Sequence, residues 1–243
     1  MAHEIRNRII RDLMHKPGMG FNELWKKEGD SNKFAYHLKV MEEDGLIEKK
    51  DNKYFLAHEG KKQAVFIDGE TGKKPENPLV ALLLVVFDGD KILLHERLKE
   101  PFYGYFGFAG AKMEFGEKIL GCAARELKEE TNLEADMKIA GLINFTTYNN
   151  GKLAYHHVQF VVKCTNPRGT LKKEDREGKY YWVDKEDFMS KKLFPDDPYI
   201  FEWLDTGNFF IAEMERFQEN DEFKDVKTKN IYWYGPIDNS KNL

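Results

Sequence analysis

Near the middle of the chain three glutamates have the spacing of a single helical face, and an arginine and a fourth glutamate precede them. Glu126, Glu129 and Glu130 follow Arg125 directly, and Glu117 precedes Arg125 by eight residues. Residues three and four apart share a face of a helix, so the three clustered carboxylates should project into one small volume. Carboxylates at that density repel one another unless a cation lies among them, and hard oxygen ligands suit Mg²⁺ or Mn²⁺. The alternative is a solvated acidic helix face.

The full spacing resembles the Nudix box, G-x5-E-x7-R-E-U-x-E-E-x-G-U, in which U is an aliphatic residue. Two positions depart from it, with Ala111 at the first glycine and Asn132 at the second. Asn tolerates a left-handed helix end, so Asn132 should still terminate the helix, whereas Ala111 would cost about 1 kcal/mol if its position requires a positive φ. The matching positions are Glu117, Arg125, Glu126, Leu127, Glu129, Glu130 and Leu133.

This resemblance implies an enzyme that hydrolyses a nucleoside diphosphate linked to another group, with Mg²⁺ or Mn²⁺ as cofactor. By position in the box, Glu126, Glu129 and Glu130 would hold the metal, and Glu129 is also a candidate catalytic residue. Arg125 would orient one of these glutamates through a charge-assisted hydrogen bond. Glu117 would assist by binding a metal through water or by pairing with Arg125.

The general base remains open, because members of this family often take it from a loop outside the box. Here Glu174, Asp175 and Glu177 precede a tyrosine-rich strand. Glu177, five residues before Trp182, matches the base position in the branch that hydrolyses oxidised-purine triphosphates. The alternative for Glu177 is an exposed loop charge without a catalytic role.

The same branch carries a Trp-Pro-Asp-Asp stretch, which corresponds here to residues 194–197. Phe194 would stack on a base, and Asp196 with Asp197 would recognise a purine edge if one acid stays protonated. Alternatively, Asp197 caps a helix and Asp196 is exposed. The Asn that contacts the base in that branch is replaced by Gly107. The resemblance predicts cleavage of a nucleoside triphosphate, or of a modified nucleotide such as an oxidised purine nucleotide, to the monophosphate and pyrophosphate.

The composition is that of a folded protein without membrane segments. The chain has 243 residues, 41% hydrophobic and 14% aromatic, which supports one large or two small packed domains. A net charge of −4 indicates no overall attraction to nucleic acid. Two cysteines in apolar surroundings favour a reducing compartment. The chain lacks an apolar run long enough for a signal peptide or a bilayer span, so a cytoplasmic protein without a membrane partner is expected.

The N-terminal part resembles a winged helix-turn-helix domain. Helices are predicted at residues 4–15, 21–27 and 31–44, the last capped by Ser31, and two short strands follow at 46–50 and 53–57. In such a motif the second helix enters the major groove of duplex DNA, and here that would be the third helix. The alternatives are an RNA-binding, protein-docking or dimerisation unit, the last giving a homodimer. The predicted DNA-binding residues are Ser31, Asn32, Lys33, Tyr36 and His37 on the helix, with Lys49, Lys50 and Lys53 on the wing.

The predicted fold class is α/β. A Nudix α/β/α sandwich with a mixed sheet should occupy residues 63–234, preceded by the small winged helix-turn-helix domain at 1–62 and followed by a tail at 235–243. Residues 60–63 are expected to link the domains, and residues 64–68 to form the first strand of the second.

Two functions follow from this organisation. The first is a nucleotide hydrolase with an accessory N-terminal domain. The second is a transcription regulator whose Nudix domain is an effector domain that senses a nucleotide metabolite. All acidic positions of the box are present, which favours catalysis, because sensing requires binding without turnover.

Overall fold

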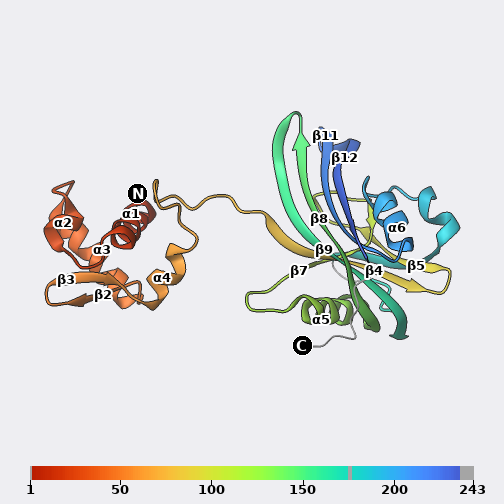
Figure 1. The fold of residues 1–243 in the computed structure, drawn as a ribbon, viewed down its shortest axis with the longest axis horizontal. Coiled ribbons are helices and arrows are strands. Elements are labelled where there is room, and N and C mark those ends of the chain that lie inside the picture. The colour runs from red at the N-terminus through yellow and green to blue at the C-terminus, as the bar shows by residue number, and fades with distance from the viewer. Residues whose placement is uncertain (1, 175–176, 236–243) are drawn as a thin grey trace. The chain divides into compact units, whose positions relative to one another are not determined.

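The computed structural model of this chain describes residues 2–174 and 177–235 (Figure 1). The chain divides into two compact units, Met1–Asn77 and Pro78–Leu243, and each is described by itself. Asp175 and residues 236–243, which form most of the expected C-terminal tail, lie outside the described residues.

The N-terminal unit consists of helices packed on a small antiparallel sheet with strand order β1-β3-β2. Ile9 and Ile10 of the first helix pack with Leu38 of the third in a single buried cluster. The three helices and the hairpin predicted from the sequence are confirmed. In chain order the elements are α1 (Ala2–His15), β1 (Met19–Gly20), α2 (Phe21–Trp25), α3 (Ser31–Glu43), β2 (Ile47–Lys50), β3 (Lys53–Leu56) and α4 (His58–Ala64).

The cap of α3 is Asp30, one residue before the Ser31 predicted. The Asp30 carboxylate accepts a 2.8 Å hydrogen bond from the backbone N–H of Lys33. Both residue types cap helices well, but a carboxylate is also attracted by the positive end of the helix dipole. The leading end of α3 therefore carries a negative charge.

The linker predicted at residues 60–63 and the strand predicted at 64–68 were both wrong. Residues 58–64 form α4, and turns follow it. Gly60 makes this possible, because a Cβ at that position would lie 1.9 Å from the carbonyl oxygen of Leu46. The helix packs onto the hairpin through this close approach, so the boundary expected between residues 62 and 63 lies inside α4.

The C-terminal unit is built on one mixed sheet with strand order β10-β5-β4-β9-β8-β11-β12. The pairs β4–β9 and β8–β11 are parallel and the other pairs on this path are antiparallel, which confirms the predicted mixed sheet. Two short strands extend it, with β6 paired to β5 and β7 paired to β4. The elements are β4 (Leu79–Asp88), β5 (Lys91–Arg97), β6 (Phe106–Gly107), β7 (Ala109–Lys112), α5 (Ile119–Thr131), β8 (Leu133–Asn149), β9 (Lys152–Gly169), β10 (Gly178–Asp184), η1 (Lys185–Ser190), α6 (Asp197–Asp205), β11 (Phe209–Glu219) and β12 (Glu222–Tyr234).

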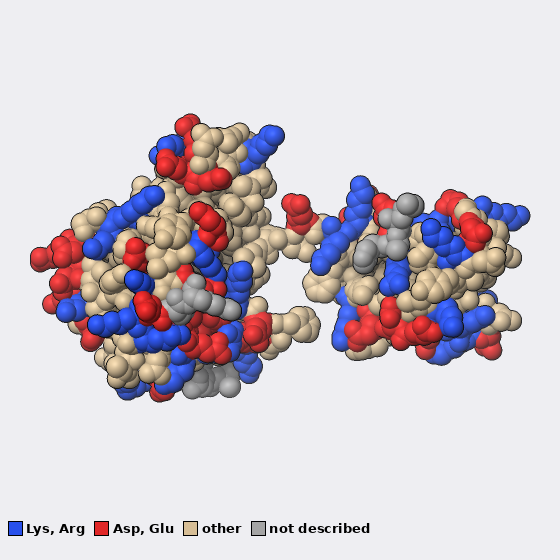
Figure 2. Space-filling view, turned by 180° about the vertical axis from the view of Figure 1, so that it is seen from behind, with Lys and Arg blue, Asp and Glu red and all other residues tan. Residues whose placement is uncertain are grey.

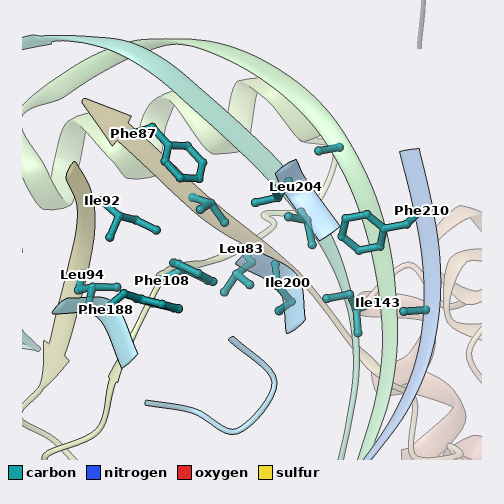
Figure 3. Close-up of a cluster of buried hydrophobic side chains, with 14 of the residues drawn as sticks. Leu83, Phe87, Ile92, Leu94, Phe108, Ile143, Phe188, Ile200, Leu204 and Phe210 are labelled. Carbon is teal, nitrogen blue, oxygen red and sulfur yellow. The ribbon is translucent and has the colours of Figure 1, made fainter. Parts of the chain in front are cut away.

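Helices cover both faces of this sheet (Figure 1). Strand β4 is apolar on both sides, because its alternate residues enter two different cores. Leu83 and Phe87 pack with Ile200 and Leu204 of α6 on one face (Figure 3). On the other face, Leu82 packs in the core that contains Cys122, Ala123 and Leu127 of α5. The two helices therefore lie on opposite sides of the sheet, as expected for an α/β/α arrangement.

Both departures from the box are accommodated locally. Asn132 ends α5 in the left-handed conformation, with φ 61°, as predicted. Ala111 lies in the regular strand β7 and is not among the described residues with positive φ, so the strain considered for it does not arise. No helix within the described ranges has the length and apolar content needed to cross a membrane.

Candidate active site

Two adjoining cavities of about 390 and about 310 Å³ lie in the C-terminal unit. We name the larger one the aromatic chamber, because Phe102, Phe145 and Phe194 line it, and the smaller one the acidic chamber, because Glu126 and Glu130 line it. The two share part of their walls and therefore form one continuous site. The residues that line both are Leu79, Arg97, Gly110, Lys112, Glu130, His157, Gln159 and Glu177.

Arg125 organises the acidic side chains around the start of α5. Its Nε and Nη2 donate to the two carboxylate oxygens of Glu117 at 2.8 and 2.9 Å, and its Nη1 lies 2.9 Å from Glu126 Oε1. The backbone N–H of Glu114 also donates to Glu117, at 3.0 Å. The Arg125 hydrogen bonds, and then that of Glu114, lower the pKa of Glu117 to about 2. Arg125 thus lies between the carboxylates of Glu117 and Glu126.

Glu126 and Glu130 lie one helical turn apart on α5 and both line the acidic chamber. Glu129 does not join them, because its side chain is 62% exposed and lies 3.3 Å from Arg125 Nη1. Glu126 contacts the same nitrogen of Arg125 at 2.9 Å, but of these two carboxylates only Glu126 lines the chamber. The expectation of three carboxylates in one small volume was therefore wrong. Within the described ranges no three metal-ligating side chains come together.

Two carboxylates in one chamber still fit a hard divalent cation. Mg²⁺ in nucleotide enzymes is typically held by one or two carboxylates, with water and substrate phosphates completing its shell. Glu126 and Glu130 provide that number of oxygen ligands, and Lys112 on the same wall provides a positive charge for phosphate. The chemistry of the donors therefore agrees with Mg²⁺ or Mn²⁺.

Glu130 is oriented by residues that the sequence analysis did not identify. The hydroxyl of Tyr180 donates a 2.6 Å hydrogen bond to Glu130 Oε2. The ring of Tyr180 is buried and stacks on His95, with 4.6 Å between the ring centroids. Tyr180 lies on β10 and His95 on the neighbouring strand β5, where they are directly paired. A tyrosine fifty residues from the box gave no signal in the sequence, because only strand pairing brings it to α5.

Of the three acids proposed as general base, Glu177 is the one whose position suits that role. It lines both chambers and forms an ion pair with Lys99. Glu174 has a 70% exposed side chain beside Lys179, and Asp175 lies outside the described residues.

Aromatic rings surround the larger chamber. The Phe102 ring lies 5.6 Å from that of Phe194 and 5.8 Å from that of Tyr155, in edge-to-face arrangements. Phe145, on strand β8, forms a further wall. Phe194 was predicted to contact a base, whereas the other three were not, since they come from separate strands and a loop. Rings in such numbers suit a flat ligand.

Asp196 and Asp197 are 0% and 2% exposed, which excludes the alternative in which Asp196 is an exposed residue. Asp197 is the first residue of α6, and Asp196 at the N-cap makes no capping hydrogen bond with its side chain. Instead, Asp196 forms a buried ion pair with Arg216, whose guanidinium carbon lies 3.7 Å from the centroid of the Phe145 ring. The strand β11 brings Arg216 to this position, and the sequence analysis missed it.

Asp197 lines the aromatic chamber with a buried side chain. Its Oδ2 is buried and has no hydrogen-bond partner in the part of the chain that the structure describes. Burial, and then the charge of Asp196, raise the pKa of Asp197 well above its usual value, against the opposite effect of Arg216. Gly107 provides the space for this arrangement. A Cβ at Gly107 would lie 2.6 Å from Phe194 and 3.0 Å from Asp197 Oδ2, so the base-contacting Asn of the related branch would not fit here.

His156 and His157 are adjacent on β9, so their side chains project from opposite faces of the sheet, and His157 lines the site. Its ring stacks on Phe145 at 4.9 Å. Burial, and then the charge of Arg216, lower the pKa of His157 to about 4. His156 instead lies 2.8 Å from Asn144 Oδ1. Alternation along a strand does not by itself show which of its two faces lines a ligand site.

In the N-terminal unit, most of the predicted DNA-binding side chains are at the surface. His37 is the exception, since it is 5% exposed and its two ring nitrogens have no partner among the described residues. It cannot reach a base edge, so this assignment was wrong. Tyr36 is 63% exposed and Ser31 is half-buried. The remaining side chains, all exposed, are Asn32, Lys33, Lys49, Lys50 and Lys53.

Comparison with known proteins agrees with this architecture. A family model described as NUDIX domain matches residues 77–204, and one described as a domain of unknown function, DUF7347, matches residues 1–67. An uncharacterized Nudix hydrolase from Bacillus subtilis is 28% identical over 119 residues, covering 49% of this chain and 73% of that protein. An ADP-ribose pyrophosphatase from Methanocaldococcus jannaschii is 39% identical over 62 residues, covering 26% of this chain and 37% of that protein.

A solved structure shows the same relationship. The crystal structure of a mutator MutT protein from Bacillus halodurans aligns with 62% of this chain and 97% of its own, with a TM-score of 0.53 and 25% sequence identity. The N-terminal match names no fold, so the winged helix-turn-helix assignment stays a prediction. The NUDIX match spans more than half of the 243 residues and contains the whole box helix α5. The chain therefore belongs to the Nudix family.

Proposed function

We propose that this protein is a Mg²⁺- or Mn²⁺-dependent hydrolase of nucleoside triphosphates or modified nucleotides, with oxidised purine nucleotides among the candidates. The products would be the monophosphate and pyrophosphate. The observation that carries the proposal is the continuity of the two chambers. One end has Glu126 and Glu130, and the other has Phe194 and Asp197. A nucleotide has the same two ends, an anionic phosphate chain and a flat base.

At the acidic end, Glu126 and Glu130 would hold the cation. The bound cation would supply Lewis-acid polarisation of a phosphoryl oxygen and a more acidic water. Arg125 keeps Glu117 and Glu126 in place through charge-assisted hydrogen bonds. Lys112 lines both chambers and would face the phosphates.

Glu177 is our candidate for the group that accepts the proton of the attacking water. It lies on the wall shared by both chambers, so it can reach a water next to the phosphate chain. Lys99 forms an ion pair with it, and the backbone N–H of Leu98 donates to its carbonyl oxygen at 3.0 Å. These contacts hold Glu177 at the wall.

At the aromatic end, a base would lie among the rings of Phe102, Phe145 and Phe194. Asp197, in its protonated form, would donate a hydrogen bond to an acceptor atom of that base. Arg216 holds Asp196 away from the ligand in a buried ion pair. In this arrangement Asp197 would contact the base directly. Asp196 would not contact the base, but would position Arg216 against the ring of Phe145.

The test is a turnover assay of the full-length protein with Mg²⁺, Mn²⁺ or EDTA. The panel contains the common nucleoside triphosphates, oxidised purine triphosphates, a dinucleotide polyphosphate, a sugar nucleotide and ADP-ribose, since a relative over part of this chain is named for ADP-ribose. Chromatography should show monophosphate and pyrophosphate from a triphosphate, and no turnover with EDTA. Highest kcat/KM for one of the last three substrates would contradict the substrate class. Absence of any turnover would contradict hydrolysis.

A second candidate function is a transcription regulator that uses the Nudix domain to sense a nucleotide metabolite. It is favoured by the exposure of Asn32, Lys33 and Tyr36 near the start of α3 and of the lysines on the β2–β3 hairpin. Two features count against strong DNA binding. Asp30 places a carboxylate at the end of α3 that would face the phosphates, and Figure 2 shows acidic and basic side chains interspersed on the visible face of this unit.

A further inference from the structure

His157 and Gln159 lie where the two chambers meet. Both residues line both chambers. They are two residues apart on β9, so their side chains project from the same face of the sheet. Their neighbours across the sheet are Leu79 and Ala81 of β4, which offer no polar atoms from their side chains.

Each of the two side chains lines both chambers and has one polar atom that is buried. Within the described part of the chain, Nδ1 of His157 and Oε1 of Gln159 are buried and have no hydrogen-bond partner. A buried polar group without a partner is costly, so such groups in native proteins are nearly always satisfied by protein, water or ligand. Because the side chains that carry these atoms line both chambers, we infer that a polar ligand group at the junction is their partner.

The position of the pair identifies the part of the ligand. The acidic chamber accommodates phosphates and the aromatic chamber accommodates a base, if the proposed function is correct. In a nucleotide the sugar lies between these two parts. We propose that His157 and Gln159 form a sugar-binding pair that recognises the ribose hydroxyls, so that the enzyme prefers ribonucleotides to 2′-deoxyribonucleotides. This inference rests on the proposed function.

The chemistry of the pair agrees with a vicinal diol. Uncharged imidazole has one donor and one acceptor nitrogen, and the Gln amide has both kinds of atom, whereas each hydroxyl donates one hydrogen bond and accepts others. Removing the 2′-hydroxyl would leave one of these buried atoms without a partner again. Sites that hydrogen-bond a substrate hydroxyl reject the analogue that lacks it for this reason.

The test compares matched ribo- and deoxyribonucleoside triphosphates with the wild-type protein. For each of ATP/dATP and GTP/dGTP, kcat/KM is measured with Mg²⁺. We expect the ribonucleotide to be favoured by about tenfold or more, as expected for the loss of one buried hydrogen bond. Equal values within about twofold for both pairs would overturn the inference while leaving the hydrolase proposal intact.

Variants then locate the preference. Gln159→Leu and His157→Phe should lower kcat/KM for the ribonucleotide and leave the deoxyribonucleotide nearly unchanged, so that the ratio approaches one. His156→Phe is the matched control, because it makes the same change on the opposite face of the same strand. Equal losses for both sugars in the site variants, or the same change of ratio in His156→Phe, would overturn the assignment.

A binding measurement tests the sugar-binding pair independently of the proposed hydrolysis. Calorimetric titration of the full-length protein with GMP and dGMP in the presence of Mg²⁺ needs no turnover. Tighter binding of GMP in the wild type, lost in Gln159→Leu, would support the sugar-binding pair even if no triphosphate is hydrolysed. Equal affinities for GMP and dGMP, or binding of neither, would overturn it.

Discussion

Arg125 and Glu117 are joined by two parallel hydrogen bonds, from Nε to Oε1 at 2.8 Å and from Nη2 to Oε2 at 2.9 Å. A guanidinium makes this paired contact with a carboxylate, whereas an ammonium group cannot. Arg125 also contacts Glu126, which lines the acidic chamber. Glu117 therefore holds Arg125 in place, and Arg125 in turn holds Glu126.

The first prediction is that Arg125→Lys lowers kcat without a comparable change in KM. Loss of a residue that orients a metal ligand typically costs about 10- to 100-fold in activity. Steady-state kinetics with Mg²⁺ would measure this. Arg168→Lys is the control, since Arg168 forms an exposed ion pair with Asp136 at 2.9 Å and should change nothing. Wild-type kinetics in Arg125→Lys would exclude an orienting role.

The second prediction separates the three acids of the box helix. Glu126→Gln and Glu130→Gln should each lower kcat by about 100-fold or more, because removal of one electrostatic contact to the reacting group typically has that effect. Glu129→Gln should have the smallest effect, because Glu129 is largely exposed. Kinetics over a range of Mg²⁺ concentrations would show this order. The largest loss in Glu129→Gln would contradict the arrangement of α5 described above.

The third prediction concerns the stability contributed by the buried acid Asp197. Its pKa is raised in the folded state by burial and by Asp196, so the folded protein binds a proton more tightly than the unfolded chain. The stability that Asp197 contributes is therefore complete below its unfolded pKa and is lost as pH rises through its folded pKa. The Asn side chain of Asp197→Asn does not titrate. The melting temperature of the wild type should therefore fall relative to that of the variant as pH rises above about 4. Asp205→Asn, at an exposed position at the end of α6, is the control. A difference independent of pH would show that Asp197 is ionised in the folded protein.

The fourth prediction concerns His157, whose pKa is lowered by burial from the usual 6.5 of histidine to about 4. Between these two values the unfolded chain binds more protons than the folded protein, so stability decreases as pH falls from 6.5 toward 4. His157→Phe should reduce this decrease, whereas His156→Phe should retain it. Melting temperatures across this pH range would decide, and identical profiles for wild type and His157→Phe would contradict the burial of the imidazole.

The fifth prediction concerns the N-terminal unit. If it binds duplex DNA, replacement of Lys49, Lys50 and Lys53 by Ala should weaken binding to all sequences and flatten the salt dependence by about 0.9 per lost phosphate contact. Asn32→Ala should instead reduce sequence preference, because Asn can reach base edges. Fluorescence anisotropy would measure both, and hydrolysis should be unchanged.

A lack of DNA binding at about 50 mM salt, where phosphate contacts are strongest, would contradict this fifth prediction. Light scattering on the full-length protein would then test the alternative of a dimerisation unit.

The sequence by itself determined the box helix and the α/β class with a mixed sheet. The fixed spacing from Glu117 to Glu130 and the left-handed end at Asn132 are local properties of one segment, so they could be predicted without the rest of the chain. The same applies to the strands, whose apolar runs and turns are continuous in sequence. Local signals failed at α4, because the close approach of Gly60 to Leu46 depends on packing between separate elements.

Only the tertiary structure decided which side chains meet at the site. Asp196 contacts Arg216, and Glu130 contacts Tyr180, across sequence distances of twenty and fifty residues. His157 enters the chamber and His156 does not, since the pairing of β9 with its neighbours determines which face of the strand lines the cavity. These contacts arise from sheet register and burial, which are properties of the packed chain as a whole, and no segment of the sequence contains them.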